Sequence, residues 1–145
     1  MGNISINHKL LSNLASEQGI RFVILHGSHA TNSAREDSDV DIALYLEPER
    51  LESFGYRTYT ATLEGVAKAL GVSADRVDLV TLNTANILLR YEITSKGKLL
   101  CGDEDAYAQY CAFAFRDYID AKPLFDLESA MIEKRHALIQ NHVAA

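Results

Sequence analysis

Apolar and polar positions along this chain follow a pattern that predicts a succession of helices and strands. Four short apolar runs bounded by glycine or polar residues predict strands at residues 20–27, 38–46, 76–82 and 98–102. Apolar residues at helical spacing predict helices at residues 7–19, 49–70, 84–97, 103–122 and 127–142. Pro123 separates the last two because proline disrupts helices, and a short helix can start at Ser28.

This order of elements predicts an α/β (α+β) fold. We expect a small mixed sheet of about four strands, flanked by helices on one side, with a C-terminal helical tail. A length of 145 residues suits one domain over residues 1–145. Its core is expected at about 20–102 and its C-terminal helices at about 103–142. The pattern leaves open whether the second and third strands pair in parallel or antiparallel.

Acidic residues interrupt two of the predicted strands. Side chains alternate along a strand, so Asp39 and Asp41 share one face of the strand at 38–46, and aliphatic residues fill the other. If the strand at 76–82 is adjacent, Asp78 can lie beside this pair. Three carboxylates on one face repel one another unless cations lie between them, and Mg²⁺ prefers oxygen ligands. The pattern therefore favours a divalent-metal site.

The alternative is that these aspartates are solvated residues at a strand end, since a D-x-D pair is common by chance. A second feature favours a binding site. Gly27 and Ser28 end the preceding strand, where free backbone N–H groups and a hydroxyl suit a phosphate. Gly-Ser, ten residues, then D-x-D occurs by chance in such a chain on the order of once in a thousand.

Composition limits the function classes. The formal net charge is −6, which argues against a basic groove for nucleic acid, so no direct nucleic-acid binding is expected. No apolar run of about 18 residues is present, so no membrane span is expected. The two cysteines, Cys101 and Cys111, form no C-x-x-C pair and are too few for a disulfide scaffold. A reduced cytoplasmic protein is the plain interpretation.

The stretch GSHATNSAREDSDVDIAL, residues 27–44, resembles a known family pattern, G-S-x-A-x-x-x-A-R-x-x-S-D-x-D-[IL]. This is the motif of the nucleotidyltransferase superfamily of DNA polymerase β. The match is closest to the minimal nucleotidyltransferases (MNT) of HEPN/MNT toxin–antitoxin pairs. The resemblance covers roughly residues 20–123 and implies a nucleotidyltransferase fold resembling the palm of polymerase β.

The resemblance also implies roles for the motif residues. Gly27 and Ser28 would contact the β- and γ-phosphates of ATP. Asp39, Asp41 and Asp78 would hold two Mg²⁺ ions, while an acceptor hydroxyl attacks the α-phosphorus in line and pyrophosphate leaves.

Two further residues of the motif are candidate ATP-binding groups with structural alternatives. Ser38 either binds phosphate or caps a turn. Arg35 either reaches phosphate or orders the loop through a salt bridge with a carboxylate.

For the whole chain, the resemblance implies a type VII antitoxin. Such a protein adenylyltransferase (AMPylator) transfers AMP from ATP to a tyrosine hydroxyl of a cognate HEPN ribonuclease toxin of the HepT kind. The short chain fits this, because little remains beyond the sheet to bind an acceptor. Two alternatives stay open: an antitoxin that masks its toxin without catalysis, and nucleotidyl transfer to a small molecule.

Overall fold

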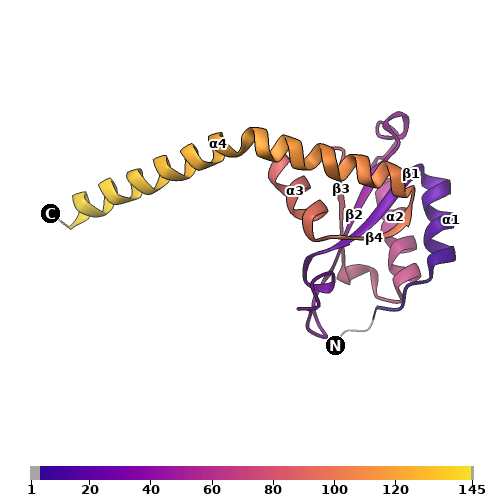
Figure 1. The fold of residues 1–145 in the computed structure, drawn as a ribbon. Helices are drawn as coiled ribbons and strands as arrows, with labels where there is room; N and C mark the ends of the chain where they lie inside the picture. Colours follow the sequence, from indigo (N-terminus) through magenta and orange to yellow (C-terminus); the bar gives the residue numbers. More distant parts are fainter. Residues whose placement is uncertain (1–3, 145) are drawn as a thin grey trace.

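A four-stranded mixed sheet forms the centre of the molecule (Figure 1). The computed structural model describes residues 4–144, so the ends of the predicted domain 1–145 lie outside the described residues. The strands are β1 (Ile20–His26), β2 (Val40–Leu46), β3 (Val77–Thr81) and β4 (Lys98–Gly102), in the order β3-β2-β1-β4. β1 runs antiparallel to β2 and β4, and β2 runs parallel to β3. The predicted mixed sheet of four strands is confirmed. The pairing of the second and third strands, whose direction the sequence left open, is parallel.

The helices begin and end largely where local capping chemistry places them. They are α1 (His8–Gln18), α2 (Tyr56–Leu70), α3 (Ile87–Lys96) and α4 (Glu104–Val143). Side chains of Asn7, Asn86 and Asp103 accept hydrogen bonds from backbone N–H groups in the first turns of α1, α3 and α4. The start predicted for the second helix was too early, because a 3-10 turn at Pro48–Arg50 precedes α2.

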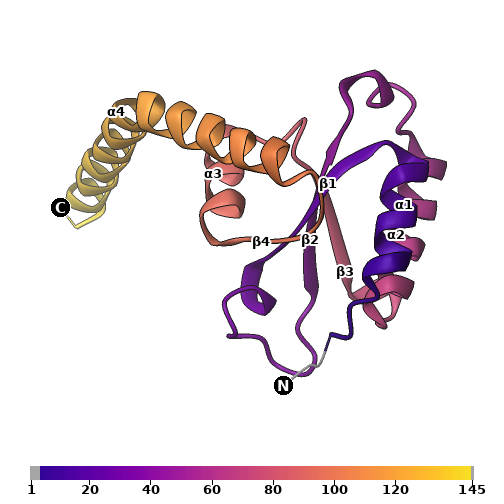
Figure 2. The same cartoon turned by 45° about the vertical axis from the view of Figure 1, so that its right-hand side comes forward.

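Helices cover both faces of the sheet, so the prediction of helices on one side was wrong (Figure 2). α1 and α2 pack with the sheet face that carries Val23, Ile42 and Leu44, forming the larger core. α3 and the first part of α4 cover the opposite face, where Phe22 and Ile24 form a second core. The reason is that both alternating sets of side chains are apolar over most of β1.

The C-terminal helix is continuous, so the predicted break at Pro123 was wrong. Proline removes one backbone N–H from a helix and strains the preceding turn, and the helix bends instead of ending (Figure 2). Lys122 donates to Asp126 at 2.8 Å, Nζ to Oδ2, across this point. We call residues 124–143 the arm, because this part of α4 extends away from the sheet (Figure 1). Within residues 4–144, none of the helices has the length and apolar character needed to cross a bilayer.

Candidate functional site

Two carboxylates and a histidine stand side by side at one end of the sheet. His26 on β1 is the register partner of Asp41 on β2, and Asp41 is the register partner of Asp78 on β3. Directly opposed residues of neighbouring strands point to the same face. The three side chains therefore share the sheet face that α3 and α4 cover further along the strands. Asp39 immediately precedes β2 and is exposed.

A tight turn brings the Gly27-Ser28 pair against these carboxylates. β1 ends at His26, and the chain turns at once into a 3-10 helix over Gly27–His29. Gly27 has φ +71°, a conformation that favours glycine, and a Cβ at this position would collide with the Asp41 carboxylate. The backbone of Gly27 and the side chain of Asp41 can share this space only because position 27 has no side chain.

The electrostatics of the site reflect burial and crowded negative charge. Burial is the main cause that raises the pKa of Asp41, the charges of Asp78 and Asp39 raise it further, and His26 and His29 lower it. Burial also lowers the pKa of His26, against the opposing influence of Asp41 and Asp78, and so favours the neutral ring. Among the described residues, the buried Nε2 of His26 has no hydrogen-bond partner. A cation or a ligand hydrogen-bond donor at this edge would offset the crowded negative charge and give Nε2 of His26 a partner.

A cleft of about 340 Å³ lies beside the turn. One wall is the end of β1 and the turn that follows, including Gly27 and Ser28, and the other is α3, which contributes Glu92 and Lys96. None of the three aspartates lines it, but Asp41 borders it through its contact with Gly27. The cleft is therefore next to the carboxylates, and its α3 wall carries one anion, Glu92, and one cation, Lys96.

The loop between the turn and β2 is held by its own hydrogen bonds. The Ser38 hydroxyl accepts from the backbone N–H of Arg35 at 2.8 Å, which is the turn-capping arrangement. The guanidinium of Arg76 donates from Nη2 to the carbonyls of Glu36 and Ser38, each at 2.9 Å, and so ties the loop to the start of β3. Arg35 itself is exposed and forms no ion pair within residues 4–144. Phosphate binding by Ser38 and Arg35 stays a prediction.

The predicted metal ligands have suitable chemistry without forming a closed cage. In the part of the chain that the structure describes, no three His, Cys, Asp or Glu side chains are close enough to enclose a metal ion. Carboxylate oxygens from Asp39, Asp41 and Asp78 are nevertheless the donors that Mg²⁺ prefers. Mg²⁺ commonly keeps several waters and takes other ligands from substrate phosphates, so an open group of carboxylates fits it.

Sequence reasoning missed two residues at this site. Lys96 lies in the last turn of α3, and only the packing of α3 beside β1 brings it opposite Ser28. Arg76 stands two residues before Asp78, and its contacts with the loop join segments 38 and 40 residues apart. Neither belongs to a motif, and only the proximity of Arg76 to Asp78 in the sequence gave a signal.

Solved structures share this fold. A chain of a toxin–antitoxin crystal structure with AMP-PNP is 21% identical, with a TM-score of 0.67, and the match covers 90% of this chain and 99% of that one. A chain from tri-AMPylated Shewanella oneidensis HEPN toxin in complex with MNT antitoxin is 20% identical, with a TM-score of 0.62 and coverage of 90% and 96%. A chain of the toxin–antitoxin MntA–HepT is 20% identical, with a TM-score of 0.61 and coverage of 90% and 97%. At this level of identity the likeness establishes the fold.

Family membership rests on the sequence. No curated protein sequence matches the chain significantly. The family model described as polymerase beta, nucleotidyltransferase, matches residues 8–106, which include the turn, all three aspartates and both walls of the cleft. The predicted resemblance is thereby confirmed, and the chain belongs to the polymerase beta nucleotidyltransferase family.

Proposed function

We propose that this protein is an antitoxin that transfers AMP from ATP to a tyrosine hydroxyl of a HEPN-family toxin. The observation that carries the proposal is the register of Asp41 with Asp78, beside Gly27 and Ser28, in a chain of the nucleotidyltransferase family. The alternation of polar and apolar residues along β2 would by itself also fit aspartates that are merely solvated at the end of a strand. The parallel pairing of β2 with β3 instead concentrates carboxylates where a phosphate-binding turn begins.

The residues of the turn and the cleft bind the triphosphate in this proposal. Gly27 lets the phosphates approach the backbone, and the Ser28 hydroxyl donates to a phosphate oxygen. Lys96 faces the same cleft and supplies a positive charge for the triphosphate. Ser38 and Arg35, in the loop before β2, are assigned to ATP binding in the same proposal.

The carboxylates hold the metal and the acceptor in the same proposal. Asp39 and Asp41 would hold Mg²⁺ beside the triphosphate, and Asp78 would hold Mg²⁺ on the side of the acceptor. Two bound Mg²⁺ ions would neutralise the triphosphate and lower the pKa of the attacking hydroxyl. Asp78 is exposed, so an acceptor hydroxyl from another protein can reach it and give up its proton there.

The proposed acceptor follows from the shape of the chain and its structural relatives. Within residues 4–144, one sheet with its helices and the arm account for the chain, and no second folded unit stands over the carboxylates. Structures of the same fold include one with AMP-PNP and one of an AMPylated HEPN toxin in complex with MNT antitoxin. We place the reaction in the cytoplasm, where ATP, Mg²⁺ and a toxin that cleaves RNA occur together.

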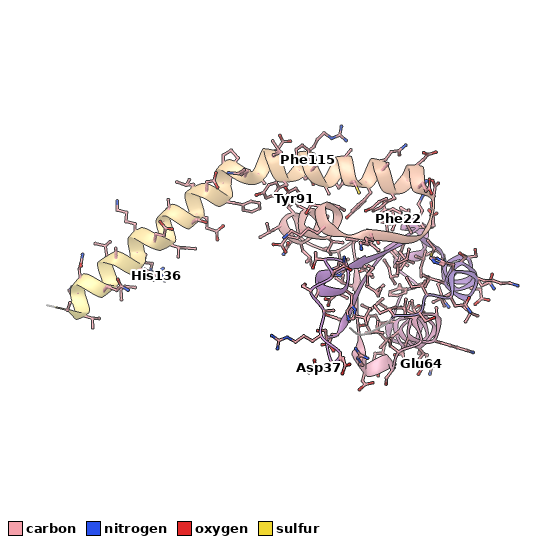
Figure 3. All side chains as sticks on the ribbon, turned by 60° about the horizontal axis from the view of Figure 1, so that its bottom comes forward. Phe22, Asp37, Glu64, Tyr91, Phe115 and His136 are labelled. Carbon is pink, nitrogen blue, oxygen red and sulfur yellow. The ribbon has the colours of Figure 1, made fainter. Side chains whose placement is uncertain are left out.

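Labelled ATP tests this proposal directly. The purified protein is incubated with Mg²⁺, ATP labelled at the α-phosphorus and a HEPN-family protein from the same genome, and the label is followed by gel and by mass spectrometry. We expect AMP on a tyrosine of the HEPN protein, and no label with Asp39→Asn or Asp41→Asn. Asp37→Asn is the matched control, because it removes the same charge from an exposed position in the same loop, outside the D-x-D pair (Figure 3).

Two outcomes would contradict the proposal. Absence of label on the HEPN protein, together with neutralisation of the toxin by the aspartate variants during co-expression, would mean that the antitoxin acts by masking. Label that appears only in a small-molecule fraction would mean that the acceptor is a metabolite.

A further inference from the structure

Asp39 differs from the other two aspartates of the site in how its backbone is held. The ladder between β2 and β3 begins at Val40, and the ladder between β1 and β2 ends at Asp41. Asp41 and Asp78 therefore take their positions from strand hydrogen bonds, whereas Asp39 is exposed and pairs with neither neighbouring strand. Contacts outside the sheet have to hold Asp39 if it is to share a metal ion with Asp41.

Tight turns in both neighbouring segments end the ladder before Asp39. On the side of β3, the next pair would join Asp39 to Arg76, but the N–H of Arg76 donates to the Ser73 carbonyl at 3.0 Å in a 3-10 turn. On the side of β1, the strand ends at His26 and the chain enters the 3-10 turn Gly27–His29. Neither segment continues its strand far enough to pair with Asp39.

Side chains from these two turns instead hold the peptide group that precedes Asp39. The Ser38 carbonyl accepts from Nη2 of Arg76 at 2.9 Å and from Nε2 of His29 at 3.2 Å. A carbonyl only accepts, so the second bond requires that Nε2 of His29 carries the proton. Nη2 of Arg76 also donates to the carbonyl of Glu36 at 2.9 Å, earlier in the same loop. The two side chains thus take the place of the strand contacts that Asp39 lacks.

The hydrogen bonds of Arg76 hold backbone and do not compensate charge. Asp75 and Asp78 are close to it in the sequence, yet within residues 4–144 Arg76 forms no ion pair. Both hydrogen bonds come from one nitrogen and go to backbone carbonyls. A guanidinium that donates to carbonyls fixes the course of the loop and leaves the carboxylates of the site available to cations.

We propose that Arg76 and His29 are positioning residues, which hold Asp39 ready for metal binding through the Ser38 carbonyl. The inference rests on the proposed function, in which Asp39 and Asp41 hold Mg²⁺ beside the triphosphate. A loop that is held before the cation arrives does not have to be ordered by it. Without these contacts, each binding event would include the entropic cost of ordering the loop, so the affinity for the cation would fall.

Cation binding in the absence of any acceptor protein tests the role of Arg76. Mn²⁺ is titrated into the full chain with α,β-methylene-ATP, which cannot transfer AMP, and is followed by electron paramagnetic resonance. Arg76→Met should weaken Mn²⁺ binding at least about tenfold, as loss of a contact behind a metal ligand typically does. Arg76→Lys should stay within about threefold of wild type, because a single ammonium can donate to both carbonyls. Arg57→Met is the matched control, since Arg57 is exposed in the first turn of α2 and should bind Mn²⁺ as wild type does.

His29 and the loop itself provide two further measurements. His29→Leu should weaken Mn²⁺ binding several-fold, and His29→Gln, whose amide can donate to the same carbonyl, should restore most of it. Hydrogen exchange without metal or nucleotide should be faster at the amides of residues 35–39 in Arg76→Met than in Arg76→Lys. The rest of the sheet should exchange alike in both, which separates a loosened loop from general loss of stability.

The outcomes distinguish this inference from the proposed function. Arg76→Met that binds Mn²⁺ as tightly as wild type overturns the inference and leaves the proposed function standing. An equal loss in Arg57→Met, or in Arg76→Lys, also overturns it, because overall charge or general damage would then explain the effect. Wild type that binds no Mn²⁺ with the ATP analogue would overturn both. The His29 variants apply the same test if Arg76→Met does not fold.

Discussion

The two faces of the sheet differ in role: one forms the larger core, and the other carries the candidate site at one end. On the face under α1 and α2, alternate residues of β2 are aliphatic from end to end, and Val40, Ile42 and Leu44 are fully buried. On the face under α3 and α4, apolar residues occupy only part of each strand. Phe22 stacks on Tyr45 at one end, with ring centroids 5.0 Å apart, and the other end carries the carboxylates.

This difference shows how a small domain can hold charges that oppose its folding. Burial raises the pKa of Asp41, so ionised Asp41 is less favourable in the fold than in the unfolded chain. Its neighbour Ile42 is fully buried in the larger core on the opposite face. Along β2, residues that stabilise the fold thus alternate with residues of the candidate site, and a substitution can change one set without the other.

The largest effect is expected from Asp41→Asn. Loss of this carboxylate should reduce AMP transfer at least about a thousandfold, because one charge that positions metal and triphosphate is gone. The free energy of unfolding should not fall, since an ionised group with a raised pKa is replaced by a neutral one of the same shape. The destabilisation that Asp41 causes is present at neutral pH and disappears below the ordinary pKa of an aspartate. Transfer assays and urea unfolding at neutral and acid pH measure the two effects.

Ile42→Ala should show the opposite profile. The side chain is 0% exposed, and its removal should lower the free energy of unfolding by about 3 kcal/mol through lost burial and a cavity. AMP transfer per folded molecule should stay close to wild type, because the residue faces away from the site. Urea unfolding and an assay at low temperature, where the variant is still folded, measure both. A variant that is stable but inactive would show that the two faces are coupled.

Lys96→Ala should weaken the nucleotide end of the site without touching the carboxylates. Loss of a cation that faces the triphosphate across the cleft should raise KM for ATP about tenfold, which corresponds to about 1.4 kcal/mol, with kcat nearly unchanged. Lys98→Ala is the control, because Lys98 begins β4 and does not line the cleft. Equal KM values for both variants would remove Lys96 from the proposed site.

Much of this division was predictable from the alternation of residues. The alternation of Asp39 and Asp41 with aliphatic residues predicted that β2 has one functional face and one buried face. The motif then predicted the family, which the match over residues 8–106 confirms. Alternation within 76–82 also predicted that Asp78 faces away from Val77 and Leu79. The structure confirms this, because Val77 and Leu79 are buried in the larger core.

Features that depend on tertiary contacts were not predictable. The parallel pairing of β2 with β3 is a tertiary contact, and the alternation of residues along each strand is the same for either direction of pairing. Helices cover both faces because Phe22 and Ile24 form a second core, which looked in sequence like part of one buried strand. Pro123 lies within one helix because the turn before it packs on α3, where Tyr118 stacks on Tyr91, and because Lys122 contacts Asp126 across it. Local propensity includes neither contact.

The smallest effect is expected from Mg²⁺ on stability, and it compares the two faces most directly. A ligand that binds only the folded chain stabilises it by RT ln(1 + [L]/Kd), about 1 kcal/mol at a few times Kd. Wild type and Ile42→Ala should both gain this increment, because the second variant keeps all three carboxylates. Asp41→Asn should gain little. NaCl at equal ionic strength is the control, since screening alone reduces repulsion in a chain of net charge −6. An equal gain in all three proteins would mean that Mg²⁺ acts on the overall charge and that the carboxylates of β2 and β3 hold no ion before the nucleotide arrives.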